Sequence, residues 1–277
     1  MLRNKIINLI EKEFFEDKEK IKNCMLPTIG FKIVSGSTDA RFSKIGGYPP
    51  IFENYWPLLN DHPLTFLGQI AMSQVNEMNN VLPKEGVLCF FIYTKDIGYR
   101  FPDCKGEFKV MYVKDHGDEL SRVKICNEKE IINEYMISFF EYFTFPSYQE
   151  SVIEKMHISE EELDVIDEID SEILLLINEN CETEHQLLGY PRALQGTVNF
   201  WWSVKYLGFQ GKETFSNHEL ELIRKEEENF ILLLQVNFND SKIEIDLFGD
   251  SVAYFGIHKN DLQACNFDNV ILVMQNT

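Results

Sequence analysis

Three short segments occur twice in the sequence, in the same order, and this repetition restricts the possible folds more than any other feature. Gly47-Tyr48-Pro49 matches Gly189-Tyr190-Pro191 at an offset of 142. The recurring apolar segments are residues 66–70 and 232–236, at an offset of 166, and residues 87–92 and 252–257, at an offset of 165. Glycine permits positive φ and proline lacks a backbone donor, so the Gly-Tyr-Pro segments must be loops. Apolar runs bounded by turn residues predict strands. We therefore predict two diverged copies of one β-rich unit.

Helices are predicted around and between the two copies. Residues 2–22 carry apolar side chains at helical spacing, and so do residues 128–143, where they recur at i, i+3 and i+4. Ser159 followed by Glu162 has the sequence of a capping box and predicts the start of a further helix. Residues 128–180 are therefore predicted to form a helical insert.

Together these elements predict an α+β protein with a mostly antiparallel β-sheet. A chain of 277 residues buries roughly three quarters of its unfolded surface, and no Gly/Ser-rich linker divides this one. We expect one compact domain over residues 1–277, with the two repeat halves at about 31–127 and 185–277. The predicted strands are residues 31–34, 64–71, 87–94, 108–113, 230–238, 242–247, 251–258 and 269–274.

The charge balance restricts the partners. The chain has 45 acidic and 26 basic residues, a net charge of −19. This field repels phosphate backbones and anionic lipids, so we expect neither nucleic acid nor membrane as a partner, and it steers basic molecules towards the protein. The sequence shows no signal peptide and no apolar stretch of membrane-spanning length, which predicts a cytoplasmic protein.

Motifs of several large enzyme classes are absent. The sequence contains no G-x-G-x-x-G, Walker A, H-E-x-x-H or G-x-S-x-G pattern, which disfavours dinucleotide enzymes, P-loop NTPases, zincins and α/β-hydrolases. The acidic run 160–170 lacks the central glycine of a calcium loop and is interpreted as the solvated face of a helix. We expect neither a metal nor a cofactor.

Gln69 and Gln235 occupy matching positions within apolar strands of the two halves. A buried amide must find hydrogen-bond partners. The structural interpretation is that each glutamine fastens the Gly-Tyr-Pro loop of its own half to the sheet. The functional alternative is that both amides face a groove between the halves and bind a ligand.

His185 is the best single candidate for acid–base chemistry, because histidine titrates near neutrality. Glu182 and Glu184 are close enough in sequence to orient it. The alternative is a loop histidine that hydrogen-bonds the adjacent turn. No cysteine lies beside it in a recognisable catalytic motif.

The assembled motifs resemble the YwqG-like family, a bacterial group classed as a domain of unknown function. The segments that carry the resemblance are residues 43–49, 56–57, 63–70, 82–88, 185–191, 195–196, 233–236 and 248–250. Phe248 departs from the tryptophan often found before Gly-Asp in that family. The resemblance implies an α+β fold with a mostly antiparallel sheet, but no established activity, cofactor or catalytic residue. Relatives found beside bacterial toxin systems imply an immunity-like or partner-binding role.

Two functions follow as hypotheses. The first is a binding protein whose ligand, a basic protein or a small polar molecule, occupies a groove between the repeat halves. The second is an enzyme that acts on a small polar substrate with His185 as the acid–base. The candidate ligand-binding residues are Tyr48, Trp56, Gln69, His185, Tyr190, Gln195 and Gln235. The oligomeric state is not defined by the sequence.

Overall fold

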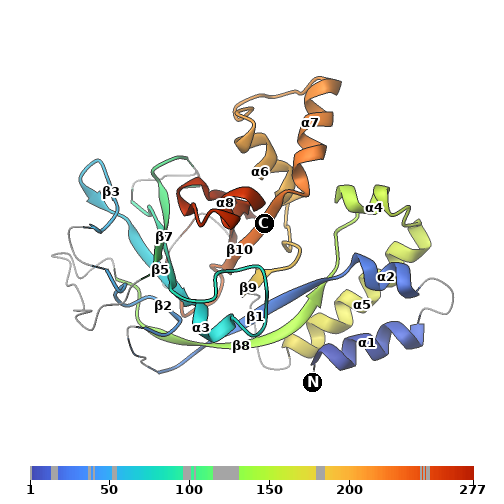
Figure 1. Ribbon diagram of the computed structural model, residues 1–277, viewed down its shortest axis with the longest axis horizontal. Coiled ribbons are helices and arrows are strands. Elements are labelled where there is room, and N and C mark those ends of the chain that lie inside the picture. Colours follow the sequence, from blue (N-terminus) through green and yellow to red (C-terminus); the bar gives the residue numbers. More distant parts are fainter. Residues whose placement is uncertain are drawn as a thin grey trace.

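The computed structural model describes residues 2–13, 18–36, 39, 41–51, 55–95, 101–102, 104–114, 131–178, 185–243, 245, 247 and 250–277. Its centre is a strongly curved antiparallel sheet of ten strands, in the order β12-β11-β10-β9-β1-β8-β2-β5-β6-β7 (Figure 1). The strands are β1 (Leu26–Val34), β2 (Lys44–Ile45), β5 (Thr65–Ala71), β6 (Val87–Ile92), β7 (Phe108–Val113), β8 (Tyr135–Thr144), β9 (His185–Leu188), β10 (Phe230–Asn237), β11 (Ser251–His258) and β12 (Ile271–Asn276). A two-stranded hairpin, β3 (Leu58–Leu59) and β4 (His62–Pro63), stands apart.

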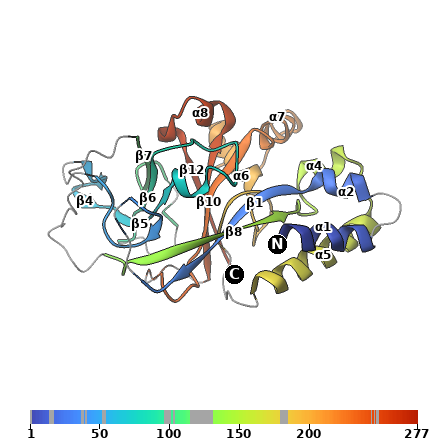
Figure 2. The same ribbon diagram turned by 60° about the horizontal axis from the view of Figure 1, so that its bottom comes forward.

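Helices surround this sheet. The described helices are α1 (Leu2–Glu13), α2 (Lys18–Cys24), α3 (Met72–Val75), α4 (Ser151–Lys155), α5 (Glu160–Asn178), α6 (Val198–Tyr206), α7 (Asn217–Glu227), α8 (Lys259–Gln263) and the 3-10 helix η3 (Phe267–Asn269). Of these, α3, α8 and η3 contribute side chains to the inner core of the sheet. Helices α1, α2, α4 and α5 gather at one end of β1 and β8 in both views, whereas α6 and α7 lie beside β10 (Figures 1 and 2). A predominantly antiparallel α+β fold is therefore confirmed.

The sheet has the same pairing pattern on either side of the central strands β1 and β8. Gln69 lies opposite Cys89 between β5 and β6, and Gln235 lies opposite Tyr254 between β10 and β11. Both ladders contain a register shift two residues before the glutamine, between Phe66 and Gly68 in one and between Leu232 and Leu234 in the other. The bulges therefore fall at matching positions of the recurring sequence segments.

The curvature brings the concave faces of the two sides together. Phe90 on β6 packs edge-on against Phe255 on β11, with ring centroids 5.2 Å apart. Each convex face is covered around a tryptophan: Trp56 over β5 and β6, and Trp202 of α6 over β10 and β11. Gly256 provides the space for Trp202, since a Cβ at this position would lie 2.3 Å from the indole ring.

The predicted helix at residues 128–143 is wrong for its described part. Residues 135–144 form β8, which pairs with β1 along nine residues and with β2 at two. Ile137 and Phe139 join one apolar core and Phe140 and Tyr142 join another. Both faces of this strand are thus apolar, which hides the period of two, and its aromatic and β-branched residues favour a strand. Residues 128–180 are consequently not a purely helical insert.

Other boundaries shift as well. The predicted helix 2–22 is two helices, and residues 14–17 between them lie outside the described ranges. The predicted strand 242–247 is also wrong where the chain is described: Asp240 accepts hydrogen bonds from Lys242 N and Ile243 N and forms a turn. The capping box of Ser159 and Glu162 is confirmed, with reciprocal hydrogen bonds of 2.7 and 3.2 Å at the start of α5.

Candidate functional site

A loop that crosses the sheet positions one wall of the site. After β9, the chain turns out of the sheet at Leu188 and Gly189, which have φ angles of 60° and 72°. It then runs across the strands, and successive strands each contribute a buried side chain that bonds its backbone. These bonds join Thr144 Oγ1 with Tyr190 N, Gln186 Nε2 with Tyr190 O, Gln235 Oε1 with Arg192 N, Tyr254 Oη with Arg192 O, and Gln275 Oε1 with Leu194 N.

The loop is also anchored on its outer side. Arg192 forms two hydrogen bonds with the carboxylate of Asp170 on α5, at 2.6 and 3.0 Å. A two-pronged arginine–carboxylate pair fixes orientation as well as distance. The loop backbone from Tyr190 to Gln195 is therefore rigidly held.

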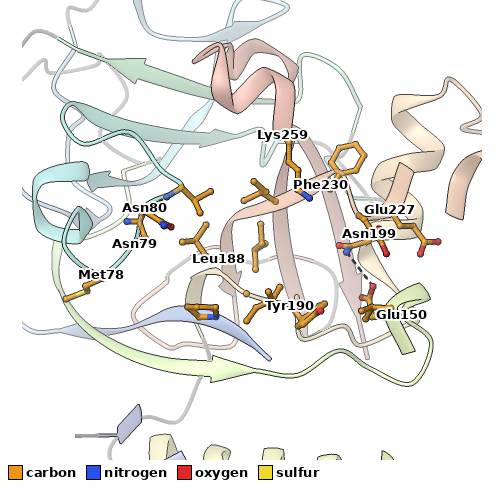
Figure 3. Close-up of a pocket in the computed structure, with 18 of the residues that line it drawn as sticks. Met78, Asn79, Asn80, Glu150, Leu188, Tyr190, Asn199, Glu227, Phe230 and Lys259 are labelled. Atoms are coloured by element: carbon orange, nitrogen blue, oxygen red, sulfur yellow. Dashed lines mark hydrogen bonds between the residues drawn. The ribbon is translucent and has the colours of Figure 1, made fainter. Parts of the chain in front are cut away.

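A cavity of about 730 Å³ opens beside this loop. Its volume falls within the range typical of sites for small molecules. One wall is the segment 77–81 that follows α3, and the opposite wall consists of α4, α6, the end of α7 and β10 (Figure 3). The cavity thus lies between a segment of the first predicted half and elements of the second.

Hydrogen-bond acceptors gather at the helical end of the cavity. Glu150 and Glu227 are 5% and 4% exposed, and both line the cavity. Asn199 Nδ2 lies 3.5 Å from Glu150 Oε2, whereas Asn199 Oδ1 is buried without a hydrogen-bond partner in the described structure (Figure 3). These side chains point into a space whose other lining is largely apolar, including Leu188 and Phe230.

Burial dominates the electrostatics of this end. It raises the pKa of Glu150 from 4.5 to about 8, with a further contribution from the negative charge of Glu227. Burial also raises the pKa of Glu227, against the hydrogen bond from Ser151. The pKa of the Tyr190 hydroxyl is raised for the same reason, so this phenol stays neutral. The site therefore carries two carboxyl groups whose ionisation depends on what occupies the cavity.

Of the seven residues proposed from the sequence, the cavity includes only Tyr190. Trp56 is buried in the core, where its indole N–H donates to Leu64 O at 2.8 Å. Tyr48 is half-buried in the first Gly-Tyr-Pro loop. Gln195 is exposed, and its backbone is held by Gln275.

Gln69 and Gln235 form hydrogen bonds with different kinds of segment. Gln235 accepts a hydrogen bond from Arg192 N at 2.9 Å, directly after Gly189-Tyr190-Pro191, as the structural interpretation expects. Gln69 instead donates to Phe42 O at 2.7 Å, ahead of β2. Both side chains are buried, and neither lines the cavity.

His185 is enclosed rather than open to a cavity. Its Nε2 lies 3.2 Å from Asp240 Oδ2, and its Nδ1 accepts a hydrogen bond from Asn237 N. The ring stacks on Phe31 at 5.0 Å between centroids. Burial lowers the pKa of this imidazole, so it is neutral near pH 7. Glu182 and Glu184, proposed to orient His185, lie outside the described residues.

Glu150, Asn199 and Glu227 were missed because nothing in their local sequence distinguishes them from surface polar residues. They come from three different helices or helix starts, and only the packing of those helices brings them together.

Comparison with protein families gives one match, the domain of unknown function DUF1963, over residues 43–275. The chain belongs to the DUF1963 family. Glu150, Tyr190, Asn199 and Glu227 lie within the DUF1963 region, whereas the two β1 residues that line the cavity, Leu26 and Pro27, precede it. Comparison with curated proteins gives no match.

Two further findings on this DUF1963 protein concern membrane spans and metal sites. None of the helices in the described ranges is long and apolar enough to cross a membrane. Over those same ranges, no group of three or more His, Cys, Asp or Glu side chains is placed to hold a metal ion.

Proposed function

We propose that this protein is a binding protein that takes a cationic side chain of a basic partner into the cavity beside Tyr190. The observation that carries the proposal is the convergence of three buried acceptor groups, from Glu150, Asn199 and Glu227, at one end of the cavity. An ammonium or guanidinium group supplies only donors and so complements this set.

The energetics favour a cation over a neutral ligand. A carboxylate buried without a counter-ion is costly, and for this reason Glu150 keeps its proton until about pH 8. A bound cation lets the carboxyl ionise and form a charge-assisted hydrogen bond, worth about 1.5–3 kcal/mol. Lysine and arginine have apolar stems that suit the apolar lining of the same cavity.

The charge of the cavity lining and the charge of the whole chain both favour a basic partner. Five glutamates and a single lysine line the cavity, namely Glu77, Glu141, Glu150, Glu227, Glu228 and Lys259. The net charge of −19 attracts a basic protein from a distance and accelerates encounter. Such a partner is compatible with an immunity-like role and with membership of the YwqG-like bacterial group, both of which we include in the proposal.

We further infer that the two sides of the sheet descend from one duplicated unit. The matching bulges and the equivalent pairing of Gln69 and Gln235 support this inference. Two β-units of separate origin are not expected to share both the position of the bulge and the position of the glutamine. The cavity lies at the junction of the two copies. The enzyme hypothesis finds no support in the position of His185, which lies outside the cavity lining.

Calorimetric titration with the peptide acetyl-(Val-Lys)3-amide tests the proposal, at an ionic strength of 0.15 M to screen surface charge. We expect Glu150→Gln with Glu227→Gln to weaken binding at least tenfold. The matched control, Glu168→Gln with Glu221→Gln, makes the same two Glu→Gln changes at exposed positions of α5 and α7 and should leave affinity within twofold. An equal loss of peptide affinity in both double variants, or no binding of the peptide to the wild-type protein, would refute the cavity as the binding site.

A further inference from the structure

The cavity lies where a strand of the sheet stops short. Strand β9 is four residues long and pairs with β1 from Thr28 to Phe31, but with β10 only at Gln235 opposite Gln186. The left-handed conformation at Leu188 and Gly189 then takes the chain out of the sheet. The neighbouring strands continue past this point.

Both neighbours border the cavity along the stretch that β9 leaves open. On one side these are Leu26 and Pro27 of β1, and on the other Phe230, Ile231 and Leu232 of β10. The cavity therefore occupies a gap in the sheet, in line with β9 and bordered by two strand edges.

The backbone of β10 presents hydrogen-bonding groups to this gap. Lys259 N donates to Asn229 O on the β11 side, and Ile231 lies opposite Ile257 in the same register. Because backbone groups alternate in direction along an antiparallel strand, those of Phe230 and Leu232 point away from β11, towards the cavity. On this side Phe230 and Leu232 pair with no strand in the described part of the chain, since β9 pairs with β10 only at Gln235, and an unpaired strand edge is a template for an added strand.

The two faces of the gap differ in chemistry. On one face lies α6, whose Trp202 packs with Phe230 and Leu232, and there Asn199, Glu150 and Glu227 gather. The opposite face is formed by the segment 77–81, where the apolar Met78 and Val81 accompany Glu77, Asn79 and Asn80, and by Leu188 and Ile231, which belong to the same apolar cluster as Met78 (Figure 3). Successive side chains of a strand point to opposite faces, so a strand in this gap would place every second residue beside Glu150 and Glu227 and the others towards Met78 and Ile231.

We propose that the partner enters the cavity as an extended polypeptide segment, in which basic and apolar residues alternate, that pairs with the Phe230–Leu232 edge of β10. This inference rests on the proposed function, to which it adds the conformation and sequence pattern of the ligand. The unpaired strand edge, the glutamates on one face of the gap, the apolar side chains on the other and the excess of glutamate in the lining all fit such an occupant.

Backbone N-methylation separates strand pairing from charge attraction, since it removes N–H donors and leaves charge intact. Two derivatives of acetyl-(Val-Lys)3-amide, N-methylated at every valine or at every lysine, are titrated into the wild-type protein alongside the parent peptide. In parallel, amide hydrogen exchange at Phe230 and Leu232 is followed by NMR with and without the parent. We expect at least one methylated peptide to bind tenfold or more weakly than the parent, and exchange at both amides to slow at least tenfold.

The possible results distinguish the two proposals. Equal affinity of the parent and both methylated peptides, with affinity lost in the Glu150→Gln/Glu227→Gln variant, would overturn strand addition and leave the cation site intact. Unchanged exchange at Phe230 and Leu232 in the bound state would overturn it too. Absence of binding by any of the peptides would overturn the proposed function itself, and this inference with it.

Discussion

Gln186 and Gln235 lie directly opposite each other on β9 and β10, and both side chains hydrogen-bond the backbone of the loop that forms the wall of the cavity. Gln186 Nε2 donates to Tyr190 O and Gln235 Oε1 accepts from Arg192 N, each at 2.9 Å. A row of buried amides thus replaces the strand pairing that the loop gives up when it leaves the sheet. Satisfied polar networks of this kind rigidify a core.

Replacement of Gln235 by alanine should destabilise the protein. The substitution removes the buried acceptor of Arg192 N, and a buried donor left without its partner costs about 1–3 kcal/mol. The measurement is the free energy of urea unfolding. Gln195→Ala serves as the control, because this side chain is exposed, and it should change stability by less than about 0.5 kcal/mol. Equal stability of Gln235→Ala and the wild type would contradict the role given to this amide.

Substitution of Gly256 by alanine should be costly because of Trp202. The new methyl group would lie 2.3 Å from the indole, inside van der Waals contact, and overpacking of this kind typically costs about 1–3 kcal/mol. Shortening the opposing ring in the double variant Trp202→Phe/Gly256→Ala should recover part of that loss. A double-mutant cycle in thermal unfolding measures this coupling. Strict additivity of the two substitutions would argue against the contact.

Glu150 should make the stability of the free protein depend on pH. Its folded-state pKa, about 8, lies above the unfolded value near 4.5, so the unfolded state releases its proton first as pH rises. The stabilising contribution of the protonated form is complete below pH 4.5 and is lost as pH rises to about 8. We therefore expect Glu150→Gln to be more stable than the wild type by a few kcal/mol at pH 9, and nearly equal to it at pH 4.5. Urea unfolding at the two pH values checks this difference, and a constant gap between the proteins would contradict it.

His185 should contribute to stability and not to binding. Burial lowers its folded-state pKa below the unfolded value near 6.5, so its contribution is present above pH 6.5 and lost as pH falls further. His185→Phe removes hydrogen bonds with Asp240 and Asn237 and should cost about 2–4 kcal/mol at pH 7. Its affinity for acetyl-(Val-Lys)3-amide should match that of the wild type. A large loss of affinity in folded His185→Phe would return this residue to the list of functional candidates.

The sequence predicts the sheet better than the site. Regular apolar runs such as 251–258 and the capping box of Ser159 carry local signals strong enough to define their elements. Strand β8 was misread because both of its faces are buried, a property that depends on neighbours far away in the chain. The adjacent Trp201 and Trp202 lie on helix α6, where Trp202 is buried and Trp201 is 42% exposed, a difference that depends on packing and not on the local sequence.

The cavity depends on long-range packing that no local pattern reports. Gln235 was recognisable because an amide within an apolar run is unusual. Glu150 and Glu227 resemble ordinary surface acids, and their burial arises only from the packing of segments that are distant in the sequence around the cavity. A search for glutamates at helix starts and ends beside apolar strands would not have separated these two from the many exposed ones.

NMR can show directly whether a basic peptide binds in the cavity beside Tyr190. Titration of isotope-labelled protein with acetyl-(Val-Lys)3-amide should shift the side-chain amide of Asn199 and the backbone amides of Glu150, Glu227 and Phe230 first and most. These four residues come from the start of α4, from α6 and from the junction of α7 with β10, and all four line the cavity. Shifts confined instead to exposed acidic residues, such as those along α5, would show that the peptide follows the surface charge and would contradict the account.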